Sequence, residues 1–234
     1  MSWTPAVRCI LWITVLTFAL QTYFFPTFDQ TFALSYVAAE NFSVHQLITY
    51  SFMHADFWHL FFNMFLIVIF GMVLERLWGT KRFLIFFAVT AIGAALIQTG
   101  VNMYDVYQAT GTPFPEVNEQ TALLNYIWGD TKNGEFLGTF LSKTIGASGV
   151  VFGVLVAFAY LFPREKLYFL LVPIPIPAKW LVIAYVALEA YLAFYASPTD
   201  NIAHFAHLGG GLFGFLMARW WKYVDVDRKL PQIR

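Results

Sequence analysis

Four polar side chains within apolar sequence have the residue types needed for acyl transfer. Ser148 lies in the segment GASGVVFG, and His207 lies in NIAHFAHLGGGLFG. His59 and Asn63 lie four residues apart in FWHLFFNMFL, a spacing that places both on one face of a helix. An imidazole can activate a serine hydroxyl, and N–H donors can stabilise the oxyanion that forms when a carbonyl is attacked. Together these residues predict a serine-type hydrolase.

The segments that carry these residues are expected to cross a membrane. The 234-residue chain is 59% hydrophobic and 12% charged, about half the charge of an ordinary soluble domain. A run of about 20 apolar residues is long enough to cross the hydrocarbon of a bilayer as a helix. We predict an all-α integral membrane bundle of six spans in one domain. The predicted spans lie near residues 7–25, 57–77, 82–102, 146–162, 178–196 and 203–221.

The charge balance and the cysteine content argue against nucleic-acid-binding, disulfide-rich and thiolate-metal proteins. Fourteen basic residues balance fourteen acidic ones, so no net charge draws the chain to nucleic acid. Cys9 is the single cysteine, which excludes an internal disulfide and a thiolate metal cage. No small-x-small cleavage site directly follows the first apolar stretch, so we interpret that stretch as a retained helix and not a signal peptide. The expected partner of most of the surface is therefore the lipid bilayer.

The distribution of Lys and Arg predicts how the spans are oriented. Twelve of these residues fall on the N-terminal segment, the second and fourth connections and the C-terminal tail, whereas the other three connections hold only Lys132 and Lys143. Cytoplasmic loops carry the excess of basic residues. Both termini are therefore expected in the cytoplasm, and residues 103–145 are expected to form an external loop insertion.

This topology gives the four polar residues one depth. The second, fourth and sixth predicted spans all begin on the outer side, and His59, Asn63, Ser148 and His207 lie within about two turns of those outer ends. At 1.5 Å per residue, this depth is on the order of 3–10 Å below the outer boundary of the membrane. Residues from three distant segments could therefore meet in one site.

Glycines at helical spacing suggest how the serine and the histidine come together. Gly149 and Gly153 follow the serine on the fourth predicted span, and Gly210 and Gly214 follow the histidine on the sixth. Small residues four apart let two membrane helices approach closely. We therefore expect the fourth and sixth spans to pack directly against each other.

The same residues resemble the signature of the rhomboid family of intramembrane proteases. The matching motifs are GASG around Ser148, AH-x-x-G-x-x-x-G from Ala206 to Gly214, and H-x-x-x-N from His59 to Asn63, in the family's order. The resemblance covers roughly residues 45–220 and implies a six-helix rhomboid-like fold whose active site is open to water from outside. It also implies transmembrane proteins as substrates. The outer position of the four residues predicts cleavage toward the outer side of the substrate's span, and we expect no metal or cofactor.

The resemblance assigns a role to each site residue. It implies Ser148 as the nucleophile, His207 as the general base and acid, and His59 and Asn63, together with Ser148, as the oxyanion hole. The residues expected to support this site are Gly146, Gly149, Phe152, Gly210 and Gly214.

Two departures from the family pattern concern the surroundings of the site. His45 and Gln46 stand where many members have a Trp-Arg pair, which leaves the anchoring of the first loop open. Phe152 stands where tyrosine is common, and a phenylalanine can stack on an imidazole but cannot donate a hydrogen bond. Neither departure removes a catalytic group.

The acidic residue that usually orients such a base has no obvious candidate in the sequence. No carboxylate lies within one helical turn of His207, and Asp200 and Glu189 are the nearest in sequence. We therefore predict a Ser–His dyad. Glu189, near the middle of the fifth predicted span, is interpreted as protonated or as bonded to a hydroxyl or water, and a role in gating is the alternative. His204 is expected near the membrane surface, in a solvated or supporting role.

Two other functions compete with an intramembrane serine endopeptidase. The first is a catalytically inactive rhomboid-like protein that binds and escorts membrane proteins; an intact Ser148 and His207 argue against it. The second is a metal-dependent membrane enzyme, which the absence of HExxH spacing and of an acidic partner disfavours. Its candidate ligands are His54, His59, His204 and His207. Together with the size and the bare six-helix plan, the resemblance implies a bacterial inner membrane as the location.

Overall fold

The computed structural model of the chain describes residues 3–25, 27–117, 137–169, 172–195 and 202–225. The described residues are mostly helical, as predicted, with one two-stranded hairpin. The elements are α1 (Pro5–Tyr23), α2 (Phe28–Phe32), α3 (Gln46–Thr49), η1 (Tyr50–Phe52), α4 (Phe57–Leu66), η2 (Ile67–Gly71), α5 (Met72–Trp78), α6 (Thr80–Thr110), α9 (Ser148–Leu161), β1 (Lys166–Phe169), β2 (Val172–Pro177), α10 (Ala178–Tyr195) and α11 (His204–Asp225).

Each predicted span contains a helix, but not every helix has the length and hydropathy of a crossing. Those that do, by length and composition, are Pro5–Tyr23, Phe57–Trp78, Thr80–Thr110 and Ala178–Tyr195. The second of these joins α4, the π-helical turn η2 and α5. Helix α9 is apolar but has 14 residues. The protein is therefore an integral membrane protein by its helices, while the count of six crossings stays a prediction.

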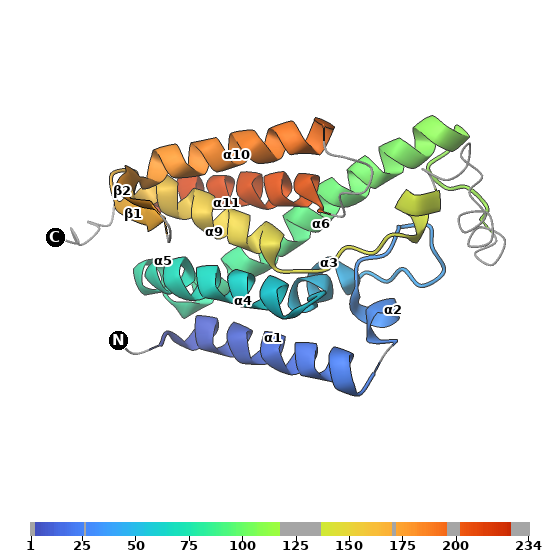
Figure 1. Ribbon diagram of the computed structural model, residues 1–234, viewed down its shortest axis with the longest axis horizontal. Helices are drawn as coiled ribbons and strands as arrows, with labels where there is room; N and C mark the ends of the chain where they lie inside the picture. Colours follow the sequence, from blue (N-terminus) through green and yellow to red (C-terminus); the bar gives the residue numbers. More distant parts are fainter. Residues whose placement is uncertain (1–2, 26, 118–136, 170–171, 196–201, 226–234) are drawn as a thin grey trace.

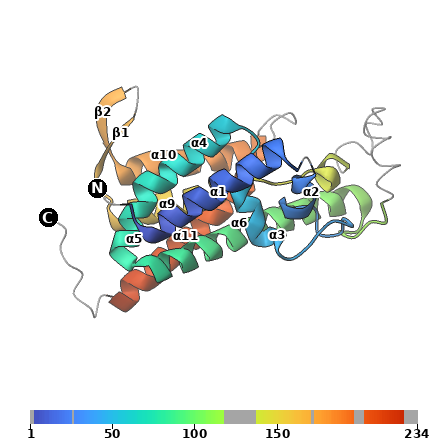
Figure 2. The ribbon, with the colours of Figure 1, turned by 90° about the horizontal axis from the view of Figure 1, so that it is seen from below.

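The long helices run along a common direction (Figure 1). In both views the start of α1 and the end of α11 lie at one end of the molecule, opposite the end that holds α2 and α3 (Figure 1; Figure 2). This arrangement is expected when a chain crosses an even number of times. The orientation of the two ends relative to a membrane stays a prediction.

Helices α9 and α11 pack backbone against backbone, which confirms the expected contact between the fourth and sixth predicted spans. A Cβ atom added to Gly214 would lie 2.5 Å from the Cα of Gly153, and one added to Gly153 would lie 2.9 Å from the carbonyl oxygen of Gly210. A Cβ on Gly210 would overlap the carbonyl of Gly149. Only hydrogen atoms fit at these positions, so the glycines set the separation of the two helices.

Helix α1 is held by a carboxylate from α5. Glu75 is 2% exposed, and its two oxygens accept hydrogen bonds of 2.8 and 2.9 Å from the backbone N–H groups of Ala6 and Val7. Its Oε1 also accepts from the hydroxyl of Thr80 at 2.8 Å. The first N–H groups of a helix have no partner within the helix. Glu75 supplies partners for two of them in α1.

Two features of the fold differ from the prediction. Helix α6 continues to Thr110, so the first part of the predicted 103–145 loop insertion is helical. Val106 is the buried residue of these extra turns, and with Tyr36 of the first loop and Phe140 of the segment before α9 it forms a small core. Residues 118–136 of the insertion lie outside the described residues. The short connection expected before the fifth span contains the antiparallel hairpin of β1 and β2. Because both strands of a two-stranded sheet are edge strands, the prolines of β2 are tolerated.

Candidate active site

Ser148 is the first residue of α9, and Gly146, two residues earlier, allows a sharp entry into the helix. Gly146 has φ +118°, a conformation that favours glycine, and its N–H donates to the carbonyl of Tyr50 at 2.9 Å. A Cβ on Gly146 would lie 2.6 Å from Nε2 of His59 and 3.8 Å from Oγ of Ser148. Gly146 therefore provides the backbone turn, and its lack of a side chain leaves space for the imidazole of His59 near Ser148.

His207 is positioned on the first turns of α11 so that its ring contacts the serine. Its Nε2 lies 2.8 Å from Oγ of Ser148, which is hydrogen-bonding distance. The start of α11 is held by Gln98 of α6, whose Oε1 accepts a 3.2 Å hydrogen bond from the N–H of Ala206. The contact also depends on the glycine-to-glycine packing of α9 and α11. The structure thus brings the two predicted catalytic residues into direct contact.

Phe152 fixes the plane of the histidine ring. Its ring and that of His207 are stacked, with centroids 4.9 Å apart and an interplanar angle of 5°. Tyr185 of α10 packs on the phenylalanine at a centroid distance of 4.6 Å. The expectation that Phe152 can stack on an imidazole is therefore met, and Tyr185 is a neighbour of the site that the sequence analysis missed.

Glu189 contradicts the expectation that no carboxylate accompanies the base. Its Oε2 lies 3.0 Å from Nδ1 of His207 and 2.6 Å from Nδ1 of His204. Glu189 and His204 are each 5% exposed, so His204 is buried in a supporting position and not solvated. The expectation failed because it looked for a carboxylate close in sequence, whereas α10 packs against α11 and brings one from 18 residues away. The sequence did contain a signal of this contact. Glu189 is an acidic residue inside an apolar span, and His204 and His207 are two histidines three residues apart on the next one.

The two predicted oxyanion donors lie on the first turns of α4. The Oδ1 atom of Asp56 accepts from the N–H of His59 at 2.9 Å and caps the helix. Asn63 is 6% exposed, and its Nδ2 donates to the carbonyl of His59 at 2.8 Å. An amide nitrogen has two N–H groups, so one remains for a substrate oxygen.

One cavity of about 330 Å³ contains all four predicted residues. Its walls come from α4, α9, α10 and α11. The lining residues are Asp56, Trp58, His59, Phe62, Asn63, Leu66, Ser148, Val151, Phe152, Tyr185 and His207. The predicted nucleophile, base and N–H donors thus face a mainly apolar space, an arrangement suited to a peptide bond of an apolar segment.

The four histidines of the rival metal site do not form one ligand cluster in the part of the chain that the structure describes. The ring of His54 packs edge-to-face on that of His59, with centroids 4.9 Å apart. A different set, Glu189, His204 and His207, offers three ligand atoms within 4.8 Å of one another. The expectation that the histidines lack an acidic partner was therefore wrong.

His54 is fully buried just before α4, and neither of its ring nitrogens has a hydrogen-bond partner among the described residues. Burial, and to a lesser degree the neighbouring His59, lowers the pKa of His54 from its ordinary 6.5 to about 3. The imidazole is therefore neutral near neutral pH. It packs as an aromatic group against His59, a predicted oxyanion donor.

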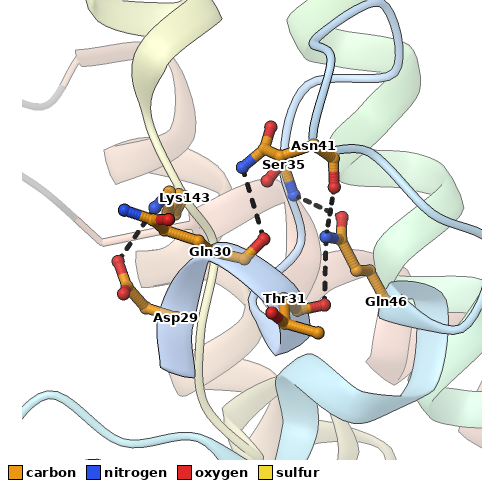
Figure 3. A network of polar contacts seen from close by, with 7 residues as sticks. All are labelled: Asp29, Gln30, Thr31, Ser35, Asn41, Gln46 and Lys143. Atoms are coloured by element: carbon orange, nitrogen blue, oxygen red, sulfur yellow. Dashed lines mark hydrogen bonds and ion pairs between the residues drawn. The ribbon is translucent and has the colours of Figure 1, made fainter. Parts of the chain in front are cut away.

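Gln46 anchors the first loop, which lacks the Trp-Arg pair of many family members. Its side chain is fully buried, and Oε1 accepts from the N–H of Ser35 at 3.1 Å. Its Nε2 donates to the carbonyls of Thr31 and Asn41 at 3.2 and 2.8 Å (Figure 3). One amide thus ties together three points of the loop. His45 contributes a further contact, from Nε2 to the carbonyl of Thr31 at 2.8 Å.

The first loop also holds the segment that leads to the nucleophile. Lys143 forms a 2.9 Å ion pair with Asp29 (Figure 3). Leu34 and Thr144 exchange backbone hydrogen bonds of 3.0 and 2.9 Å. These contacts position residues 143–147 immediately before α9.

Comparisons with known proteins show the family to which the chain belongs. The profile of the Rhomboid domain family matches residues 41–222. Among curated proteins, the chain is 28% identical over 183 residues to "Rhomboid protein 1, mitochondrial" of Saccharomyces cerevisiae, covering 78% of this chain and 43% of that protein. It is also 28% identical over 193 residues to "RHOMBOID-like protein 12, mitochondrial" of Arabidopsis thaliana, covering 78% of this chain and 49% of that protein. The chain spans about half the length of the curated relatives it matches.

Proposed function

Because the chain belongs to the rhomboid family, we propose that it is an intramembrane serine endopeptidase that cleaves transmembrane proteins. The observation that carries the proposal is the 2.8 Å contact between Nε2 of His207 and Oγ of Ser148, inside a cavity that His59 and Asn63 also line. A hydroxyl, a base and N–H donors facing one cavity are the groups that acyl transfer requires. An inactive binding protein would have no need of this contact.

In the proposed mechanism the site cleaves a peptide bond in two steps. His207 takes the proton of the Ser148 hydroxyl as the oxygen attacks the substrate carbonyl, while His59 and Asn63 donate to the developing oxyanion. His207 then gives the proton to the leaving amine, which departs and leaves an acyl-enzyme. Water, deprotonated by the same imidazole, hydrolyses the ester and restores the serine. A substrate helix enters laterally and unwinds near the outer boundary of the membrane.

The proposed location is a bacterial inner membrane with both termini in the cytoplasm. The two relatives are named as mitochondrial proteins, so fractionation of the source cells is the measurement that decides the membrane. The orientation is tested with single cysteines in a Cys9→Ser chain. Cysteines at positions 120 and 200 should react with an impermeant thiol reagent in intact cells, and one at position 228 should not. The opposite pattern contradicts the proposed orientation and the outer position of the site.

A fluorophosphonate probe tests the proposed function most directly. The purified chain should be labelled, and it should cleave a model transmembrane substrate in liposomes. Ser148→Ala should lose both properties. The matched control is Ser142→Ala, which removes a serine hydroxyl six residues earlier, where it donates to the carbonyl of Thr139 at 2.9 Å. Labelling of the Ser148→Ala variant, or proteolysis by it, contradicts the proposal.

A further inference from the structure

We propose that Glu189 is a positioning residue that orients His207, so that the protein works with a Ser–His–Glu triad. The inference rests on the proposed protease function. Its basis is a continuous set of contacts across the imidazole, 2.8 Å from Ser148 to Nε2 and 3.0 Å from Nδ1 to Oε2 of Glu189. The serine and the carboxylate bind opposite nitrogens of one ring.

The carboxylate determines which ring nitrogen carries the proton. An ionised carboxylate only accepts hydrogen bonds, so a contact with Nδ1 requires an N–H there. A neutral His207 with its proton on Nδ1 has its lone pair on Nε2, where it can take the proton of Ser148. The opposite tautomer would present an N–H to the serine and could not act as a base. Glu189 therefore selects the reactive tautomer.

The carboxylate also stabilises the charge that forms during the reaction. When His207 takes the serine proton, a positive charge develops on a ring that is 8% exposed. The other polar groups near it in the described structure are the hydroxyl of Tyr185 on α10, the imidazole of His204 on α11, and His59 and Asp56 at the start of α4. Asp56 accepts a hydrogen bond from the N–H of His59, whereas the Glu189 carboxylate contacts the His207 ring directly, and a charge pair at this distance interacts strongly in a largely buried site.

His204 holds the carboxylate in place. Its Nδ1 donates to the same Oε2 atom at 2.6 Å, from one turn earlier on α11. A buried carboxylate needs such partners because its transfer from water is otherwise costly. With two imidazole N–H groups on one oxygen, the side chain of Glu189 has little freedom to turn away from His207.

The distances favour direct hydrogen bonds over a bound metal ion. Ligand atoms around a tetrahedral zinc, with bonds of about 2.0–2.1 Å, lie about 3.3 Å apart. Nδ1 of His204 and Oε2 of Glu189 are 2.6 Å apart, which is too close for two ligands of one zinc ion. Inhibition by a chelator with recovery on adding zinc would overturn the inference in favour of a metal site.

The test compares Glu189→Gln with Glu75→Gln in the full chain reconstituted in liposomes. The control removes the charge of the other buried glutamate described above, which binds backbone N–H groups and lies away from the cavity. In Glu189→Gln we expect kcat and the rate of fluorophosphonate labelling to fall by on the order of 10²-fold or more, with KM within about threefold of wild type, because the tautomer is no longer fixed. The acid limb of the rate profile should move to lower pH. Glu75→Gln should keep the wild-type profile and have a lower Tm.

A loss of activity in Glu189→Gln that follows its Tm, with an unchanged pH profile, would assign Glu189 a purely structural role. Unchanged kinetics would overturn the inference as well. The ¹⁵N chemical shifts of the His207 ring, assigned with a His207→Ala sample, test it independently of activity. A proton on Nδ1 in wild type that is lost or shared in Glu189→Gln supports it, and a proton on Nε2 in wild type overturns it. If wild type neither labels nor cleaves, the proposed protease function fails while the ring tautomer still decides the orientation of His207.

Discussion

Two buried glutamates in this protein show how the partners of a side chain decide its use. Glu75 and Glu189 are 2% and 5% exposed. Glu75 binds two backbone N–H groups and a threonine hydroxyl, which act here only as hydrogen-bond donors. Glu189 binds two imidazoles, a kind of side chain that can both accept and donate a proton. The first carboxylate therefore fastens one helix to another, and the second belongs to a group of residues that can move protons.

The largest expected effects come from replacing Ser148 and His207, the two residues proposed to carry out the reaction. Ser148→Ala and His207→Ala should each reduce cleavage by roughly 10⁴-fold or more, because each removes a member of one unit. The double variant should be no worse than either single variant. All three variants should stay folded, because neither substitution adds bulk to the contact of α9 with α11. The measurements are turnover of a model transmembrane substrate and thermal unfolding in the same detergent. Additive losses would contradict a shared unit.

The oxyanion donors should have a smaller effect. Asn63→Ala and His59→Ala are each expected to lower turnover by about 10²–10³-fold, the usual loss for one donor among several. The effect should fall on kcat, because the donors bind the oxyanion and not the ground-state carbonyl. The matched control is Phe62→Leu, which changes a cavity wall without removing a donor. Wild-type turnover in both alanine variants would leave these residues a packing role only.

The structural carboxylate should affect stability and not catalysis. Glu75→Gln retains an oxygen acceptor but loses the charge, so we expect the free energy of unfolding to fall by about 1–3 kcal/mol. A thermal melt measures this change, and cleavage per folded molecule should stay within twofold of wild type. A large fall in kcat without a change in Tm would place Glu75 in the reaction and remove the contrast with Glu189.

Near neutral pH the smallest expected effect is that of His54, whose ring nitrogens have no hydrogen-bond partner among the described residues. His54 has a folded-state pKa of about 3, below its ordinary 6.5, so the unfolded chain binds more protons between these values. The contribution of His54 to stability is therefore present above about pH 6.5. It should be lost by up to about 1.4 kcal/mol per pH unit as the pH falls toward 3.

Replacing the imidazole tests this pH dependence. His54→Leu should flatten the decline of Tm on acidification, because the unfolded chain no longer gains a proton at this position. The matched control is Met53→Leu, a buried apolar neighbour whose change should shift Tm equally at every pH. An equally steep decline in His54→Leu and wild type would show that the acid sensitivity arises elsewhere.

Much of this arrangement could be predicted because it depends on local pattern. Apolar stretches predicted the helices, and the family resemblance is confirmed by the Rhomboid domain match. Glycines spaced four apart predicted the contact of α9 with α11, and that contact brings Ser148 and His207 together. The catalytic roles of these residues stay predictions, although the geometry permits them.

The missed features depend on contacts between distant segments. Glu189 reaches His207 from another helix, and Gln98 supports the start of α11 from α6. Gln46 anchors the first loop through three backbone groups that no spacing rule identifies. In each case a single polar residue in apolar or loop sequence finds its partner only after the chain has folded, so the sequence shows the residue but not the partner.

The length of α6 has a mechanical consequence. Its 31 residues, at 1.5 Å each, make a rod of about 46 Å, whereas the hydrocarbon of a bilayer is about 30 Å thick. The excess lies at the end of the molecule where α2 and α3 are found, and protein covers part of it through Val106 (Figure 1). The end of α6 thus projects as a rigid helix at that end of the molecule, which is also the end where α9 and α11 begin (Figure 1). In the proposed endopeptidase, a folded domain of a substrate on that side would have to clear this helix, so the length of α6 would set a minimum tether between such a domain and the scissile bond.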